Sequence, residues 1–446
     1  MAAMDEQLLH EVVEAALKAG AGAAEAAFAE RQSLSVTVRL GALEEAEREE
    51  ARDLGLRVFI GQRQAVVSGS DISREGRSKL IERAVAMARL APEDPYAGLA
   101  PPERLAKGPA PDLDLFDPNE PDPETLEARA LAAEEAARAV AGVTNSDSSS
   151  AAWSASAWRL VTSGGFSGHH RASGFSLSAV AIAGEGAGME RAGEGRQTRW
   201  QSDLPSAESI GAEAGRRAVS RLGPRKIAST TAPVIFENRL AASILGPLIS
   251  AISGPSVARG VSFLKDRLGQ EVFSAAVTIT DEPHRPRGLG SSPFDDEGVA
   301  NRAMAIIEAG VLTTWLLNTP SARQLGLETT GHAARGLAGP PGVGPSNLTL
   351  QPGARSQAEL MADAGAGLLV TSLFGPSLNP NTGDWSVGCG GFWFERGEIA
   401  YPVSEITVAG NLIEAYARVV PGSDLEFRGA ANAPSLLIDA LAIAGK

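Results

Sequence analysis

The chain has 446 residues, which is too long for one ordinary hydrophobic core, and we expect two domains. Its 40 basic and 54 acidic side chains give a formal net charge of −14 with no local basic patch, which argues against direct binding of nucleic acid. A single cysteine, Cys389, excludes an internal disulfide framework and favours a reducing compartment.

The beginning of the chain, MAAMDEQ, lacks the basic stretch and apolar run of a signal peptide. The most apolar run covers residues 240–252 and contains Pro247, so it is shorter than the roughly 20 residues that a membrane span requires. The sequence therefore predicts a cytoplasmic protein without a membrane segment.

The first part of the chain alternates predicted helices and strands. Apolar residues at spacings of three and four predict helices over residues 6–18 and 73–90, the second beginning at the N-cap residue Ser73. Strand-like runs at 34–40, 56–60 and 65–68 predict a β-hairpin around Gly61. The charged run 45–52 is typical of a solvated face, and the proline-rich residues 91–121 are typical of an extended surface connector.

Further along, an alanine-rich helix is predicted over 123–141 and another over 206–222. Three strand-like pieces lie between them, at 154–162, 174–183 and 195–201. These elements predict an N-terminal α+β domain, residues 1–228, in which an antiparallel sheet is covered by helices.

The second half changes to short apolar runs separated by glycine and proline. We expect a strand at 232–236 and a buried helix at 240–252, and then strands or hairpins at 277–280, 303–317, 348–350, 367–373, 391–395 and 403–409. Many short strands with regular turns predict a β-rich C-terminal domain, residues 229–446, that is barrel-like or sandwich-like.

An ordered set of sequence phrases carries a family resemblance. It covers about 170 residues and comprises GVSFLKDRLG at 260–269, VTITD at 277–281, SPFDDEG at 292–298, IEAGVL at 307–312, TGHAAR at 330–335, SNLTLQPG at 346–353, TGDWS at 382–386 and residues 399–412. No single phrase is specific, but the set resembles the TldD/PmbA family (peptidase U62 type), whose members also carry the label of modulator of DNA gyrase. The helix at 73–90, followed by PEDPYAG at 92–98, agrees with the first half of that family.

The resemblance implies a cytoplasmic metallopeptidase complex that degrades or trims unfolded peptides. In this family a metal-bearing subunit, TldD, pairs with a second subunit of the PmbA/TldE type. The metal-bearing type places a His-Glu-x-x-x-His helix near residues 250–266, where this chain has SAISGPSVARGVSFLKD, with neither histidine nor glutamate. A metal-ligating cysteine near the C-terminus of the metal-bearing type also has no match in residues 427–435.

The chain therefore resembles the PmbA/TldE type, a subunit without its own metal or catalytic residues that supports a zinc ion on a TldD-like partner. We expect that partner, an unfolded peptide as substrate, and possible homodimers of the isolated chain. A β-rich domain offers sheet edges to which an unfolded peptide can add as a strand.

Six polar residues are candidates for contact with a peptide or a partner. Asp295, Asp296 and Glu297 form the most prominent polar group, and the alternative interpretation is a solvated turn whose aspartate caps the next element. Asn347, Asp384 and Ser386 are similar cases, also open to a purely structural interpretation.

Two other functions remain open at this point. The chain could be a self-sufficient metallopeptidase with unusual ligands drawn from His169, His170, His284, His332 and Cys389. It could also be a non-enzymatic binding or regulatory protein, in line with the gyrase label.

Overall fold

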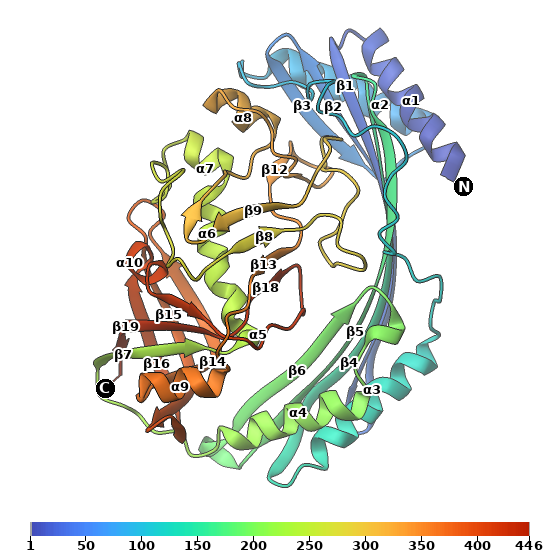
Figure 1. Cartoon of the computed structure of the whole chain (residues 1–446). Coiled ribbons are helices and arrows are strands. Elements are labelled where there is room, and N and C mark those ends of the chain that lie inside the picture. The colour runs from blue at the N-terminus through green and yellow to red at the C-terminus, as the bar shows by residue number, and fades with distance from the viewer. Residues whose placement is uncertain (1, 446) are drawn as a thin grey trace.

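The computed structural model describes residues 2–445 and has two regions (Figure 1). The sheet region, residues 2–220, is a long curved antiparallel sheet with helices. The barrel region, residues 230–445, lies inside the curve of the sheet. The predicted α+β class and the antiparallel N-terminal sheet are confirmed, and the β-rich part contains a closed barrel.

Six antiparallel strands form the sheet, in the order β3-β2-β1-β4-β5-β6. Their bounds are β1 Ala23–Arg39, β2 Ala42–Ile60, β3 Arg63–Gly69, β4 Val143–Thr162, β5 Ser167–Ala183 and β6 Glu190–Thr198. Four of these strands are much longer than the strand runs predicted from the sequence. Residues 42–53 were not expected to form a strand, because their charged side chains show no alternation of apolar and polar residues.

Four helices cover one face of this sheet: α1 Ala2–Lys18, α2 Arg74–Leu90, α3 Pro123–Arg138 and α4 Ala207–Ser220. Three of them begin at a side-chain cap, supplied by Ser73, Asp122 and Ser206, and the predicted cap at Ser73 is confirmed. Even-numbered residues of β1, such as Ala26 and Val36, are buried against the helices. Successive side chains in a strand point to opposite faces, so the odd-numbered residues face away from the helices.

The face away from the helices has two parts. Near β3, Ala27 and Leu160 are buried in a small apolar cluster with Phe294 and Val299 of the barrel region. Toward the other end, this face carries small hydroxyl side chains, half-buried at Ser33, Ser35, Thr37, Ser150, Ser154, Ser176 and Ser178. The barrel region therefore packs on the sheet at one end, and a polar sheet surface continues beyond this contact.

Five strands of the barrel region close on themselves: β7 Thr230–Phe236, β14 Ala366–Leu378, β15 Asp384–Glu395, β16 Glu398–Asn411 and β19 Leu436–Ala444. The order is β16-β15-β14-β7-β19, and an additional pairing of β19 with β16 completes the ring. Short β17, Val419–Pro421, pairs with β19 beside the ring. Closure satisfies the backbone of these strands, which leaves the barrel with few free edges.

A second sheet, in the order β10-β9-β8-β13-β18, connects the barrel to the sheet region. Its strands are β8 Ile279–Asp281, β9 Met304–Glu308, β10 Val311–Leu312, β13 Leu348–Leu350 and β18 Ala431–Asn432, with a separate pair of β11 Ala333–Ala334 and β12 Gly342–Val343. The helices of the barrel region are α5 Asn238–Ala241, α6 Leu245–Ile252, α7 Gly254–Ala258, α8 Thr319–Leu325, α9 Gln357–Ala364 and α10 Leu412–Tyr416. Three 3-10 turns occur in the described chain: η1 Gly186–Gly188, η2 Gln201–Asp203 and η3 Ala242–Ile244.

The single helix predicted at 240–252 is wrong in detail, because the chain forms α5, η3 and α6 in succession. Pro247 lacks the N–H that would bond to a preceding carbonyl, and the turn before it tightens into a 3-10 turn. The expected strand or hairpin at 303–317 is present only as β9 and β10. Among the helices of residues 2–445, none has the length and apolar character that crossing a bilayer requires.

Candidate functional site

The segment at 250–266, where the family resemblance places a zinc helix, consists of the end of α6, the short helix α7 and the loop that follows it. Ala251 and Ile252 at the end of α6 are buried in the barrel core, and the Ser250 hydroxyl donates to the Gly246 carbonyl at 3.1 Å. Gly254 begins α7, where a Cβ atom would lie 2.3 Å from the Ser321 hydroxyl of α8. Neither imidazole nor carboxylate is available on α6 and α7, so these residues do not fit a zinc ion.

The acidic loop at 295–297 is buried at the contact between the two regions. Asp295 is 5% exposed, and its carboxylate accepts backbone N–H groups from Glu297 at 2.9 Å, Val299 at 2.8 Å and Ala333 at 3.0 Å. These bonds fold the loop and attach it to β11. The alternative interpretation of this loop as a solvated turn is wrong for Asp295, although its side chain does organise the turn.

The other two acids of the loop reach different neighbours. Asp296 accepts the Arg335 backbone N–H at 2.8 Å, and Glu297, 2% exposed, accepts the Thr319 N–H at 2.8 Å with Oε2. The second oxygen, Oε1 of Glu297, makes no hydrogen bond with a protein atom. The loop thus connects β11, the beginning of α8 and the sheet.

A buried ion group joins this loop to the sheet. Glu25 of β1 pairs with Arg57 of β2 at 3.3 Å and with Arg335 of the barrel region, and all three side chains are at most 2% exposed. We call these residues, together with Asp296 and Glu297, the inter-region cluster. Oppositely charged side chains removed from water are stable only while each has its partner, so this cluster fixes the two regions relative to each other.

Burial changes the protonation of the acidic loop. Burial raises the pKa of Asp296 to about 6, although the Arg335 backbone N–H and guanidinium oppose this change. Burial, together with the neighbouring Glu297 carboxylate, raises the pKa of Asp295, and burial also raises that of Glu297. Carboxyl groups with a raised pKa are common at functional sites. For Asp295, however, the three hydrogen bonds from backbone N–H groups already explain why a buried carboxyl group is needed.

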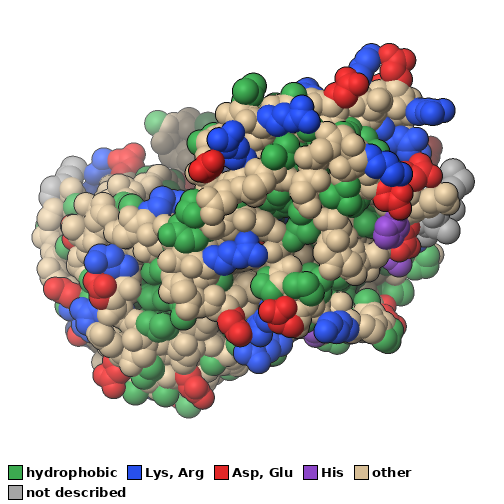
Figure 2. Space-filling model, turned by 90° about the horizontal axis from the view of Figure 1, so that it is seen from above, with side chains coloured by type: hydrophobic (Ala, Val, Ile, Leu, Met, Phe, Trp, Pro, Cys, Tyr) green, Lys and Arg blue, Asp and Glu red, His purple; other side chains and the backbone are tan. Residues whose placement is uncertain are grey.

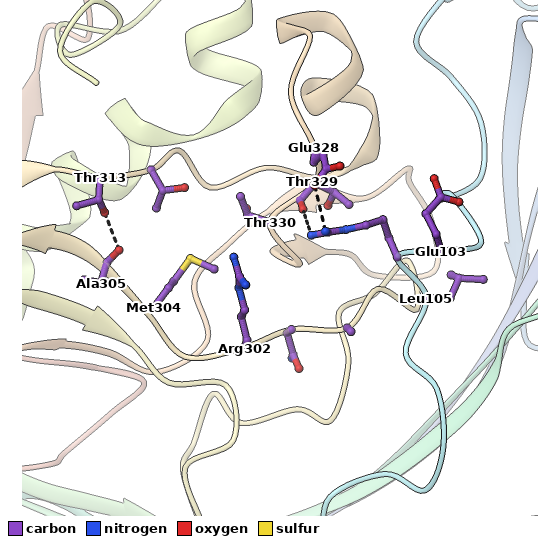
Figure 3. A pocket seen from close by; sticks show the side chains of 13 residues that line it. Glu103, Leu105, Arg302, Met304, Ala305, Thr313, Glu328, Thr329 and Thr330 are labelled. Atoms are coloured by element: carbon purple, nitrogen blue, oxygen red, sulfur yellow. Dashed lines mark hydrogen bonds and ion pairs between the residues drawn. The ribbon is translucent and has the colours of Figure 1, made fainter. Parts of the chain in front are cut away.

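Beside the loop lies a cavity of about 590 Å³ between the connector and the barrel region (Figure 3). Arg104 of the connector closes one side by binding Glu328 at 3.1 Å and the Thr329 carbonyl at 3.0 Å. Arg302 is exposed and points into the cavity. Met304 and four threonine residues also line the cavity.

The other candidate residues lie elsewhere. Asn347 is 1% exposed and holds a loop together, since its amide donates to the Glu282 carbonyl and the Ser291 hydroxyl, both at 2.7 Å. Asp384 and Ser386 lie on β15 beside a surface hollow that includes Pro380. Asp384 is exposed and accepts hydrogen bonds from the Thr382 hydroxyl and the Asn411 amide. The six candidates are thus distributed over three separate places.

The potential metal ligands are also dispersed. His332 is buried between Thr330 at 2.8 Å and Asp281 at 3.2 Å, and the His284 ring bonds to Asn301 at 2.7 Å. His169 and His170 are neighbours on β5, where burial lowers the pKa of His170 to about 4.

Cys389 is buried in β15, and this burial raises the pKa of its thiol to about 12. Within residues 2–445, no group of three or more His, Cys, Asp or Glu side chains has an arrangement that could hold a metal ion. That this chain binds no metal stays a prediction, which metal analysis of the purified protein would test.

The sequence did not indicate Glu25, Arg57 or Arg335 as site residues. Arg335 does lie at the end of the TGHAAR phrase, which was the available signal for it. Glu25 and Arg57 lie on the face of the sheet that points away from the helices. From the sequence alone, a charged residue at such a position is expected to be exposed to solvent. Only the packing of the barrel region on the sheet buries them.

Three family models match the chain in order. They are PmbA/TldA metallopeptidase domain 1 over residues 24–88, the central domain over 116–222 and the C-terminal domain over 229–445. The chain belongs to the PmbA/TldD metallopeptidase family. It is 39% identical to metalloprotease PmbA of Escherichia coli O157:H7, covering 99% of this chain and 97% of the relative. A PmbA homolog of Haemophilus influenzae is 36% identical over 97% of this chain and 94% of its own length.

Solved structures agree with this membership of the PmbA/TldD family. A proposed modulator of DNA gyrase from Bacteroides thetaiotaomicron superposes with a TM-score of 0.92, at 28% identity and 99% coverage of both chains. TldE from Thermococcus kodakarensis superposes with a TM-score of 0.87 over 98% of this chain and 100% of its own, and at 21% identity this similarity concerns the fold alone.

Proposed function

We propose that this chain is the metal-free subunit of a TldD/TldE-type peptidase complex that degrades or trims unfolded peptides in the cytoplasm. In this proposal a TldD-like partner carries the zinc ion, which activates water for attack on the peptide bond. This chain binds the extended substrate and completes the chamber around the partner's site. It supplies no metal ligand and no catalytic group.

One observation carries the proposal: the packing at residues 250–258. A family member that held zinc there would need imidazole nitrogens and a carboxylate directed into open space. Here Ala251 and Ile252 are buried in the barrel core, and a Cβ atom at Gly254 would lie 2.3 Å from the Ser321 hydroxyl.

A peptidase assay with three samples tests this function. The samples are the purified chain alone, a metal-bearing family member alone, and the two together, each with an unfolded peptide substrate. We expect EDTA-sensitive cleavage in the mixture and none from the chain alone. Robust EDTA-sensitive cleavage by the chain alone would contradict the division of roles.

The self-sufficient metallopeptidase is a weaker alternative. The rings of exposed His284 and buried His332 each bond to a side-chain partner, and Cys389 is buried in strand β15 of the barrel. A ligand set drawn from them would require these hydrogen bonds to be broken. A non-enzymatic regulatory role has support only in the name given to related structures.

A further inference from the structure

Strand β2 has an edge that no other strand covers. Residues 54–60 pair with β3, but the preceding part of β2, residues 42–53, pairs only with β1. In the described part of the chain, no backbone hydrogen bond joins residues 42–53 to any segment other than β1. The outward N–H and C=O groups of this strand are therefore available to another chain.

The free edge is held in place although it is exposed. Side chains from Ala42 to Glu50 are all exposed, whereas Val36 and Val38 of the paired strand are buried under α3. The turn that connects the two strands is fixed by Glu134 of α3, which is 1% exposed and accepts the N–H groups of Leu40 at 2.7 Å and Gly41 at 2.6 Å. An edge that is already ordered loses little entropy when a strand adds to it.

The charge of this edge indicates what could bind. Arg48 pairs with Glu50 and Glu120, and Arg52 pairs with Glu30. Four further glutamates make no ion pair with any residue that the structure describes: Glu44, Glu45, Glu47 and Glu49. The edge therefore carries an excess of unpaired negative charge.

The glutamates are also arranged for strand recognition. Glu45, Glu47 and Glu49 alternate along β2 and lie on one face, opposite Thr37, Ser35 and Ser33 of β1. They therefore extend the hydroxyl-bearing face of the sheet to its free border. A strand added there would place every second side chain next to one of these glutamates.

We propose that the free edge of β2, residues 42–53, binds an extended basic peptide by strand addition, with Lys or Arg side chains at alternate positions facing Glu45, Glu47 and Glu49. This inference rests on the proposed function, and it adds a preferred substrate class and a location. A second copy of this chain fits poorly, because antiparallel pairing of two such edges would place glutamates beside glutamates. On the face that Figure 2 shows, by comparison, basic and acidic side chains are interspersed.

Peptide binding to the full chain, measured by fluorescence anisotropy at low salt, tests the proposal. The probes are an 11-residue peptide of alternating Lys and Thr, a matched peptide of alternating Glu and Thr, and the Lys peptide with N-methyl groups at alternate backbone nitrogens. We expect the Lys peptide to bind at least about tenfold more tightly than either of the others, since charge and main-chain pairing both contribute.

Matched variants locate the site. The triple variant E45Q/E47Q/E49Q should weaken binding of the Lys peptide about tenfold. The control E82Q/E185Q/E308Q removes the same charge at exposed positions away from this edge and should change binding less than about twofold. All six substitutions are at exposed positions, so loss of folding does not confuse the result.

Unchanged binding in the edge variant, or an N-methylated peptide that binds equally well, would overturn the inference and leave the proposed function standing. Failure of every peptide to bind would also overturn the inference, whereas the proposed function is decided separately by the peptidase assay with the metal-bearing family member. A third outcome, loss of co-elution with a metal-bearing family member while peptide binding is unchanged, would assign the edge to a subunit contact and also overturn the inference.

Discussion

The acidic loop at 295–297 and the acidic edge of β2 look alike in sequence but differ completely in structure. Asp295 and Glu297 are buried, and together they accept four backbone N–H groups. Glu45 and Glu47 are exposed, and within residues 2–445 neither forms an ion pair. A run of acids thus stabilises the protein where backbone donors surround it, and remains available for binding where they do not.

The difference arises from what lies opposite each acid. The loop lies where the barrel region packs on the sheet, so its carboxyl groups have lost water and depend on protein partners. The β2 edge extends beyond this contact. Substitutions in the acidic loop should therefore lower folding stability. Substitutions at the β2 edge should instead weaken ligand binding.

The largest effect on stability is expected for Glu25→Gln. This change leaves Arg57 and Arg335 buried without their shared carboxylate, and a buried pair broken on one side typically costs about 3–5 kcal/mol. Urea denaturation followed by circular dichroism measures the loss. Glu30→Gln, on the same strand in a more exposed pair with Arg52, is the matched control and should cost less than about 1 kcal/mol. Equal losses for the two variants would contradict the role of the inter-region cluster.

A smaller effect is expected for Asp295→Asn. One amide oxygen can replace only part of a carboxylate that accepts three N–H groups, and the amide nitrogen would face a donor. We expect a loss of about 1–3 kcal/mol in the free energy of unfolding. Asp384→Asn, at an exposed position, serves as the control. If the two variants are equally stable, the loop does not depend on the Asp295 carboxylate.

The pH dependence of stability offers a third test, through Asp296. Burial raises the pKa of Asp296 in the folded protein to about 6, above the ordinary value of 3.8, so the folded state holds the proton more tightly than the unfolded state. The resulting stabilisation is complete below pH 3.8 and is lost as the pH rises through 6. Relative to Asp296→Asn, the unsubstituted protein should therefore lose stability between pH 4 and pH 7. A gain over that range would contradict the burial of this carboxyl group.

The smallest effect on stability is expected at the β2 edge. The variant E45Q/E47Q/E49Q should change the free energy of unfolding by no more than about 0.5 kcal/mol, because these side chains make no contact that folding requires. Thermal unfolding monitored by circular dichroism is sufficient to check this. A large loss would mean that the edge contributes to folding, and the contrast with the acidic loop would no longer hold.

Local signals in the sequence predicted much of the fold. The cap at Ser73 with its apolar spacing predicts α2, and the short apolar run at Leu348–Leu350 predicts β13. The length of β1 and β2 was not predictable in this way, because residues 42–50 are exposed on both faces and carry no apolar alternation. An alternation of apolar and polar residues appears only where one face of a strand is buried. This part of β2 is stabilised by backbone pairing with β1 rather than by burial of its side chains.

The candidate site was less accessible from sequence. The family phrases drew attention to residues 295–297, but Arg335 and Glu25 are separated by 310 positions. No spacing rule connects residues so far apart. The free edge of β2 was likewise missed, because a charged run in sequence gives no indication of which strand edge lacks a neighbour.

The central claim is that this chain holds no catalytic metal of its own. Zinc analysis of chelator-free protein, before and after dialysis against zinc, tests it most directly. We predict far less than one zinc per chain in both samples. One tightly bound zinc per chain, retained after gel filtration, would contradict the account.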